Sequence, residues 1–183
     1  RQKLKGTVTN MDSDLKSLEM VATVSDFSTL DLPRIAQLIN KSNQFNLTTR
    51  RRSEAEIAQL SESEKYNGFS VRLADKFGDH GLISVVIGEL HDDSLKIDTW
   101  VMSCRVLSRQ VEEFVMNEIF NRASRLECQK IIGQYYPTSR NQMVSDLYAK
   151  LGFELKSRSD EVTNFEIMLN QITPKSTHIT LKR

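Results

Sequence analysis

The stretch from Cys104 to Val111 has the residue types and the position for binding a phosphate group. It joins an apolar run that predicts a strand to an apolar-periodic run that predicts a long helix. A helix that begins there places free backbone N–H groups and the positive end of its dipole beside the end of the strand, where they attract an anion. The alternative is an ordinary strand-to-helix turn in which Ser108 caps the helix.

The strands that must position this turn follow from the apolar pattern. Segments rich in Val, Ile, Phe and Trp predict seven strands, three of them in a meander joined by turns at Gly78–Gly81 and His91–Ser94. The strands are expected at Leu18–Phe27, Phe69–Phe77, Leu82–Leu90, Ile97–Cys104, Lys130–Tyr136, Phe153–Ser157 and Phe165–Leu169.

Helices are expected between these strands. Ser53 and Glu56 form a capping box, and Gly152 is a natural residue to follow a helix end. Ile97–Cys104 is too apolar for either of its faces to be exposed to water, so helices should cover both sides of the sheet. The fold class is therefore predicted as α/β, with a mixed, mostly antiparallel central sheet of about seven strands flanked by about four helices. Apolar residues at helical spacing place these helices at Leu32–Ile39, from Ser53 onward, at Val111–Leu126 and at Val144–Leu151.

Length and composition exclude several classes of protein. With 183 residues, the chain is long enough for one domain and short for two. A formal net charge of +1 offers no strong field for nonspecific binding of nucleic acid or of an anionic membrane. Two cysteines cannot build a disulfide framework, and His80, His91 and His178 form no metal-ligand pattern. No apolar run approaches the roughly 18 residues of a membrane helix. We expect a soluble protein of a reducing cytoplasm, without a metal and without nucleic-acid or membrane partners.

Both ends of the chain are polar. Residues 1–17 have little periodicity and are interpreted as a linker or frayed helix that follows an upstream domain. The sequence starts with Arg1 and a polar stretch, which indicates a piece of a longer protein. The predicted domain covers residues 18–170, and residues 171–183 are expected to form a polar C-terminal tail.

Two motifs and three longer stretches resemble a known family. The motifs are Arg105-x-x-Ser108-x-Gln110 and the run from Asn141 to Phe153, NQMVSDLYAKLGF. Together with the order of the elements, they resemble the GNAT superfamily of acyl-CoA-dependent N-acyltransferases. The longer stretches resemble the C-terminal, GNAT-like half of FkbH-like proteins, and the resemblance covers nearly all of residues 31–169. They are RIAQLINKSNQFNLTTRRRSEAEI (34–57), DKFGDHGLISVVIG (75–88) and IDTWVMSCRVLSRQVEEF (97–114).

The resemblance to FkbH-like proteins implies a biosynthetic context. Such proteins carry a HAD-type half upstream, which loads a glyceryl unit from a glycolytic bisphosphate onto an acyl carrier protein for methoxymalonyl and related polyketide extender units. No apolar strand in this sequence ends in an Asp-x-Asp-x-Thr motif, so the glyceryl-transfer chemistry is not assigned to it. The partners that the resemblance implies are an acyl carrier protein and an upstream HAD-like domain.

The resemblance also implies a site for a pantetheine thioester, carried by coenzyme A or by a carrier protein. The sheet is expected to open beside Arg105–Val111 and to accept the thiol-tipped arm. Ser108 and Gln110 stand where the family has glycines, which costs about 1 kcal/mol or more if the backbone is left-handed there. A carrier's arm lacks the adenosine diphosphate and is the smaller ligand for such a loop. The expected contacts are Met102, Cys104, Arg105, Val106, Leu107, Ser108, Arg109, Gln110, Val111 and Asn141, the last of which is also a good helix cap.

Tyr148 and Asp98 are the candidate catalytic residues. Tyr148 stands where many GNAT enzymes keep a general acid for the departing thiolate. The alternative is core packing, because Tyr148 lies on an apolar stripe. Asp98 is the candidate base, or else it is paired structurally. Cys104 is expected to be a small buried residue rather than a nucleophile.

The segment after the first predicted helix is the candidate substrate loop. It is expected to contact a polar acyl group, a phosphate or an acidic carrier surface. The alternative is a loop held by its own hydrogen bonds, with Arg50–Arg52 solvated. The candidate contacts are Asn43, Gln44, Phe45, Asn46, Thr48 and Arg50.

Two functions remain open from the sequence. One is an acyltransferase in which Tyr148 protonates the leaving sulfur and Asp98 or water takes a proton. The other is a noncatalytic module that docks an acyl carrier protein or supports the upstream half.

Overall fold

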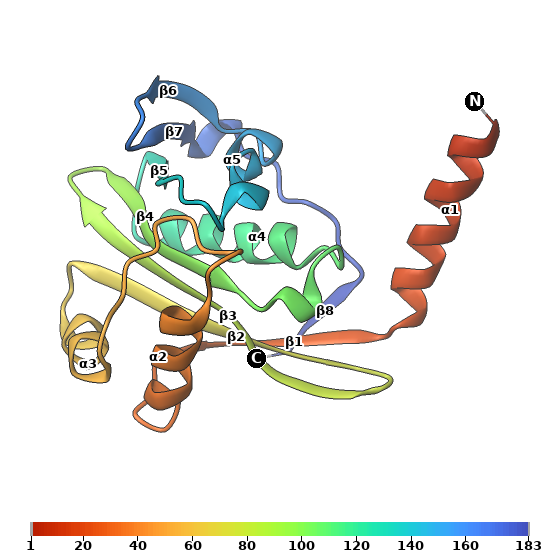
Figure 1. Ribbon diagram of the computed structural model, residues 1–183, viewed down its shortest axis with the longest axis horizontal. Coiled ribbons are helices and arrows are strands. Elements are labelled where there is room, and N and C mark those ends of the chain that lie inside the picture. Colours follow the sequence, from red (N-terminus) through yellow and green to blue (C-terminus); the bar gives the residue numbers. More distant parts are fainter. Residues whose placement is uncertain (1, 183) are drawn as a thin grey trace.

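One mixed sheet of eight strands forms the centre of the protein (Figure 1). The computed structural model describes residues 2–182, with side chains described from residue 10 onward. The strand order is β6-β7-β5-β4-β3-β2-β1-β8, and neighbours are antiparallel except in the parallel pairs β4–β5 and β1–β8. The strands are β1 (Met20–Asp26), β2 (Tyr66–Asp75), β3 (Gly78–His91), β4 (Ser94–Met102), β5 (Lys130–Tyr135), β6 (Glu154–Arg158), β7 (Thr163–Met168) and β8 (Ile179–Lys182).

Helices cover both faces of the sheet, as the apolar character of β4 predicted. On one face, α2 (Leu32–Lys41) and α3 (Glu54–Glu62) pack their apolar side chains on β3 and β4. On the other face, α4 (Val111–Arg125) and α5 (Leu147–Lys150) pack around Trp100 in the larger core. The predicted α/β class and mixed sheet are therefore confirmed.

Local sequence signals are found where they were expected. The Ser53 hydroxyl accepts a hydrogen bond from the Glu56 backbone N–H at 3.2 Å and begins α3. Gly152, just after α5, has φ 95°, a value that favours glycine. The expected helix at Val144–Leu151 is instead a 3₁₀ turn at Gln142–Val144 followed by the short α5. Both helix types return a side chain to the same face every three to four residues. The apolar residues of this segment therefore stay on one buried face although the helix is interrupted.

The first turn of the meander lies earlier than predicted. It is formed by Lys76 and Phe77, and Gly78–Gly81 belong to β3. The Asp75 carboxylate accepts a hydrogen bond from the Phe77 N–H at 2.8 Å, and Asp75 pairs with Gly78 across the turn. This local bond closes the hairpin before the glycine-rich stretch begins.

The two ends of the chain contain elements that the sequence did not specify. Residues 171–183, expected as a polar tail, include β8, which pairs with Met20–Thr23 of β1. The strand has only four residues, Ile-Thr-Leu-Lys, and Ile179 is the one that is buried, so its apolar signal in the sequence is short. The N-terminal segment, interpreted as a linker or a frayed helix, is the helix α1 (Gln2–Ser17), which leads away from the sheet (Figure 1). Leu15 near the end of this helix packs against the larger core. Among residues 2–182, no helix has the length and apolar character needed to cross a membrane.

Candidate functional site

The predicted opening of the sheet lies between β4 and β5, but the chain itself fills it. The two strands pair only from Ser94–Ile97 to Lys130–Gly133, and beyond this the segment Phe45–Thr48 lies between them. The Met102 N–H donates to the Phe45 carbonyl at 3.2 Å, and the Leu47 N–H donates to the Trp100 carbonyl at 3.4 Å. On the other side, the Tyr136 N–H donates to the Leu47 carbonyl at 2.9 Å. The backbone groups at the free edge of β4 are thus already paired.

Asn141 fixes this segment in place. Its side-chain N–H₂ donates to the carbonyls of Asn46 (3.0 Å) and Tyr136 (2.9 Å). Its side-chain oxygen accepts from the Thr138 N–H at 2.8 Å and from the Tyr135 hydroxyl at 3.2 Å. Asn141 is fully buried and makes no side-chain helix cap. Every hydrogen-bonding group of the side chain of Asn141, a predicted cofactor contact, is thus bonded within the chain.

The predicted substrate loop divides at Phe45. Phe45, Asn46 and Thr48 are buried, and the Thr48 hydroxyl donates to the Asp98 carbonyl at 2.8 Å. The Asn46 oxygen accepts from the Thr49 N–H at 2.8 Å. These residues therefore form the internally bonded loop that was the alternative to substrate binding. Asn43 and Gln44 remain accessible at the surface.

Asp98 is a structural ion-pair partner rather than a base. Its carboxylate is fully buried and accepts from the guanidinium groups of Arg50 (2.6 Å) and Arg52 (2.7 Å) and from the Thr99 hydroxyl (3.0 Å). Three of the roughly four lone-pair sites of this carboxylate are thus occupied by donors of the chain itself. The structure therefore places Asp98, the predicted base, and Arg50, a predicted substrate contact, in one ion pair, which was the structural alternative for Asp98.

Tyr148 lies in the core, against the rings of Trp100, Phe153 and Phe165 with centroid separations of 6.1, 4.9 and 5.7 Å. The backbone of Gly133 approaches the ring so closely that an added Cβ would lie 2.8 Å from it. Burial raises the pKa of the Tyr148 phenol far above its usual value. Among the side chains described, from residue 10 to 182, its hydroxyl has no hydrogen-bond partner. Of the two alternatives for Tyr148, general acid and core packing, its surroundings in the structure favour core packing.

Replacing Tyr148 by phenylalanine is expected to raise the free energy of unfolding by about 1 kcal/mol. The change removes a buried hydroxyl without a partner and keeps the shape of the ring. Urea unfolding measures the effect. The matched control is Tyr135→Phe, which loses the bond to Asn141 and should be destabilised by about 1 kcal/mol. Equal losses of unfolding free energy in Tyr148→Phe and Tyr135→Phe would contradict the conclusion that the Tyr148 hydroxyl has no partner.

The predicted cofactor loop mixes core and surface residues. Met102, Val106 and Val111 are buried in the core. Arg109 forms an ion pair with Asp75 at 3.0 Å, which ties the loop to β2. Cys104 is exposed, contrary to the expectation of a buried thiol, because it lies beyond the end of β4 in a 3₁₀ turn at the surface.

Both positions at which the family has glycine are left-handed. Ser108 has φ 61° and Gln110 has φ 67°, so two side chains occupy a backbone conformation that favours glycine. The Gln110 side-chain oxygen accepts from the His178 N–H at 2.8 Å and thereby holds the segment that leads into β8.

The Ser108→Gly variant is expected to be more stable by about 0.5–1 kcal/mol. Relief of the left-handed strain outweighs the added entropy of the unfolded chain. The Gln110→Gly variant should gain little stability, because it also loses the hydrogen bond to the His178 N–H. Thermal unfolding measures both, and Ser145→Gly at φ −58° is the control that should be destabilised. A stabilised Ser145→Gly variant would contradict this explanation.

A cavity of about 560 Å³ lies beside the start of α4, and we call it the α4–α5 cavity. Acidic side chains line it at the end of the helix dipole that attracts anions. Burial, together with the nearby charge of Glu113, raises the pKa of the Glu112 carboxyl. Its lining includes Leu107, Ser108 and Gln110 of the loop, Glu112 and Glu113 of α4, Asp146 and Lys150 of α5, and the apolar residues Met11, Leu15 and Phe45.

These residues do not fit coenzyme A. The edge of β4 that would bind the pantetheine arm is paired with Phe45 and Leu47. The place of the diphosphate holds the side chains of Ser108 and Gln110 and two carboxylates in the first turn of α4. Two negative groups in this position repel a diphosphate. No chemical step is assigned to coenzyme A in this chain.

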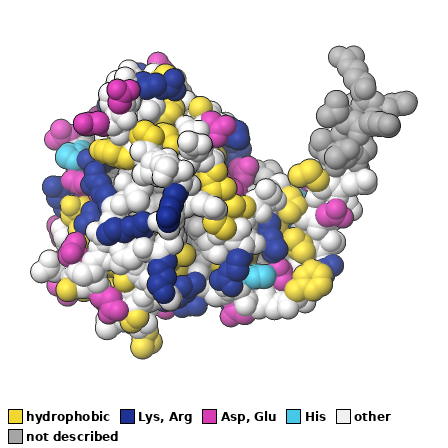
Figure 2. Space-filling model, viewed as in Figure 1, with side chains coloured by type: hydrophobic (Ala, Val, Ile, Leu, Met, Phe, Trp, Pro, Cys, Tyr) yellow, Lys and Arg dark blue, Asp and Glu magenta, His cyan; other side chains and the backbone are white. Residues whose placement is uncertain are grey.

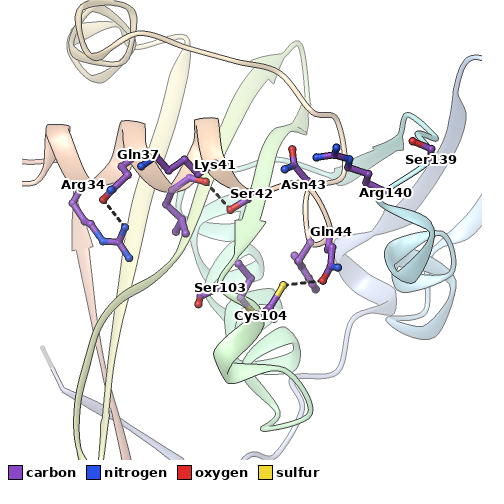
Figure 3. A pocket seen from close by; sticks show the side chains of 13 residues that line it. Arg34, Gln37, Lys41, Ser42, Asn43, Gln44, Ser103, Cys104, Ser139 and Arg140 are labelled. Carbon is purple, nitrogen blue, oxygen red and sulfur yellow. Dashed lines mark hydrogen bonds between the residues drawn. The ribbon is translucent and has the colours of Figure 1, made fainter.

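A second cavity, of about 730 Å³, opens between α2 and the 139–140 turn (Figure 3). Its polar lining contains three cationic residues and no carboxylate. Phe45 lines both this cavity and the α4–α5 cavity, so its ring stands between them. We call the second cavity the basic cleft and define its polar lining as Arg34, Lys41 and Arg140, Gln37, Asn43 and Gln44, and Ser42, Ser103, Cys104 and Ser139.

Sequence reasoning found only part of the basic cleft. Asn43, Gln44 and Cys104 were candidate site residues, and the structure brings them together there. Arg34 and Lys41 were missed, although a spacing of seven residues places both on the same face of α2. Arg140 is about a hundred residues away in the chain, and no local pattern connects it to α2. Among the described residues, no cluster of three His, Cys, Asp or Glu side chains could hold a metal ion.

Comparisons with known proteins define the fold. No protein-family model and no curated protein matches the sequence. The ribosomal-protein-S18-alanine N-acetyltransferase from Escherichia coli matches in structure with a TM-score of 0.61 and 14% identity, over 81% of this chain and 94% of that chain. The spermidine N-acetyltransferase from Vibrio cholerae, solved in complex with CoA and spermine, matches with a TM-score of 0.62 and 17% identity, over 82% and 96%. The chain therefore has the GNAT fold.

Proposed function

We propose that this chain is the GNAT-fold domain of an FkbH-like protein of polyketide extender-unit biosynthesis, and that it is a noncatalytic module which docks an acyl carrier protein. One observation carries the noncatalytic part of the proposal. Phe45 and Leu47 pair with the edge of β4 at which a pantetheine thioester would bind. The burial of Tyr148 and the pairing of Asp98 with two arginines support the same conclusion.

The charge distribution supports docking of an acidic partner. The chain as a whole has a net charge of only +1. In the view of Figure 2, several Lys and Arg side chains nevertheless lie close together on the face that carries α2 and the segment after it. A cationic face steers an acidic protein into the correct orientation even when the total charge is small. The resemblance to FkbH-like proteins suggests an acyl carrier protein as that partner.

Acyl transfer is the second candidate function, and the fold of the solved neighbours favours it. The Vibrio cholerae enzyme is described as bound to CoA and spermine. For the same reaction here, Phe45–Thr48 must leave the edge of β4, break the bonds to Trp100, Met102 and Tyr136, and expose two buried apolar side chains. Burial of Phe45 and Leu47 opposes that opening.

Calorimetry with three ligands tests the proposal. The acyl carrier protein should bind, more weakly as salt is raised, with the same affinity whether or not its arm carries an acyl group. Acetyl-CoA should not bind, and Tyr148→Phe should bind the carrier as the unchanged chain does. Measurable binding of acetyl-CoA, or acyl transfer that Tyr148→Phe abolishes, would establish the acyltransferase instead. A carrier protein that fails to bind would exclude docking.

A further inference from the structure

We propose that the basic cleft binds the phosphate group of a small polar ligand. Figure 3 shows Arg34 and Lys41 on α2 and Arg140 on the opposite side of the cavity. Positive charges therefore approach the cavity from two elements that lie about a hundred residues apart in the chain.

Of the cations of the basic cleft, Arg34 is half-buried, and Lys41 and Arg140 are exposed. Arg50 and Arg52 pair with Asp98, Arg109 with Asp75 and Arg122 with Glu118. By contrast, Arg34, Lys41 and Arg140 have no carboxylate within 4.0 Å among the side chains described from residue 10 to 182. Like charges gathered without a counter-charge repel one another, and an anion in the cleft relieves that repulsion.

The carboxamide side chains of the cleft are arranged as donors. The Gln37 oxygen accepts from Arg34 Nη1 at 2.8 Å, and the Gln44 oxygen accepts from Cys104 Sγ at 3.2 Å (Figure 3). The Asn43 oxygen accepts from Arg51 Nη2 at 2.6 Å. An arginine can only donate, so the orientation of the Gln37 and Asn43 amides is determined by their partners. Each of the three oxygens is therefore engaged, and the N–H₂ groups are the part of each amide that remains for a ligand.

This set of donors suits a phosphate better than a carboxylate. A phosphate presents three or four oxygens in a tetrahedron and can accept from several directions, whereas a carboxylate offers two oxygens in one plane. Guanidinium and ammonium groups are the usual partners of phosphate oxygens. The hydroxyls of Ser103 and Ser139 add donors at the rim. The cavity of about 730 Å³ is within the range of sites that hold a small organic ligand, so there is room for a polar chain beside the phosphate.

The phosphate can come from two sources. It can be the phosphodiester of a carrier protein's pantetheine arm, in which case the inference rests on the proposed function. It can also be a free phosphate ester, in which case the cleft is a small-molecule site that requires no carrier protein. The shared chemistry is the phosphate group.

Titration of the full chain with inorganic phosphate tests the site. Calorimetry should detect saturable binding that chloride at equal ionic strength does not reproduce. The variants Lys41→Gln and Arg140→Gln should each weaken binding about tenfold or more, because each removes one charge-assisted contact. Lys156→Gln, which removes an exposed cation on the edge strand β6, is the matched control and should bind as the unchanged chain does. Absent binding, or binding that the two cleft variants leave unchanged, would overturn the proposal.

Cys104 reports where the phosphate binds. Its thiol is exposed in the cleft, whereas Cys128 is buried and serves as an internal reference for alkylation. Phosphate should slow the reaction of Cys104 with iodoacetamide in the unchanged chain and in Lys156→Gln, and it should do so much less in Arg140→Gln. Protection that is equal in all three proteins would place the phosphate elsewhere and overturn the assignment.

Carrier proteins with and without the phosphopantetheine arm separate the two sources. If the carrier protein with the arm protects Cys104 and the carrier protein without it does not, the arm is the ligand. Protection by O-phosphoserine, without binding of either carrier protein, would identify a free phosphate ester. That second result would leave the cleft proposal standing while excluding the proposed docking function.

Discussion

The Phe45→Ala variant is expected to lose about 3–5 kcal/mol of unfolding free energy. The ring is 3% exposed and meets the edge of Trp100 at a centroid distance of 5.9 Å. Its removal leaves a cavity that joins the basic cleft to the α4–α5 cavity, since Phe45 lines both. Loss of the buried ring and the cost of that cavity both act against the folded state.

Urea unfolding measures this loss, and fluorescence shows its location. Trp100 is the single tryptophan and is fully buried. Acrylamide should therefore quench its emission more strongly in the variant than in the unchanged chain. Phe77→Ala is the control, because Phe77 is 78% exposed in a turn and its truncation should change stability by less than about 0.5 kcal/mol. Similar stabilities of the two variants would show that Phe45 does not close the sheet.

The Asp98→Ala variant is expected to lose about 3 kcal/mol of unfolding free energy. The substitution leaves Arg50 and Arg52 without their carboxylate at the edge of the core. Arg52 is the more buried of the two, with 16% of its side chain exposed against 37% for Arg50. The larger part of the penalty should therefore come from Arg52, which water can reach least.

A double-mutant cycle isolates the ion pair. Starting from Arg52→Gln, the further change Asp98→Ala should cost clearly less than it does in the unchanged chain, because the more buried of the two stranded cations is already gone. Asp146→Ala is the surface control, since its ion pair with Lys150 is largely exposed and should contribute less than about 0.5 kcal/mol. Additive effects of the Asp98 and Arg52 substitutions would refute the coupling.

Much of the architecture could be read from local patterns. The seven predicted strands, α4 and the capping box at Ser53 depend on residues that are close together in the chain. Alternation, helical spacing and caps act over a few residues, so a single sequence displays them. The sequence analysis missed β8 because the strand has only four residues, Ile-Thr-Leu-Lys, and its order depends on pairing with β1, more than 150 residues earlier.

The candidate site depended on contacts that no local pattern contains. The sequence shows that residues 43–52 are mostly polar, but it does not show which of them lie at the surface and which are buried. Arg50 and Arg52 reach Asp98 across 48 and 46 residues, and Asn141 reaches Asn46 across 95. These bonds depend on the divergence of β4 and β5, which leaves an edge of β4 with which Phe45–Thr48 pairs.

By itself, the sequence determined the α/β class, most of the strands and helices, and the presence of side chains where the family's loop has glycine. Tertiary structure alone decided that Ser108 and Gln110 are left-handed, that Tyr148 and Asp98 are buried, and that Arg34, Lys41 and Arg140 line one cleft. The physical reason is the range of the forces concerned. Backbone preference and apolar periodicity act between near neighbours, whereas burial and charge pairing depend on which distant segments the folded sheet brings into contact.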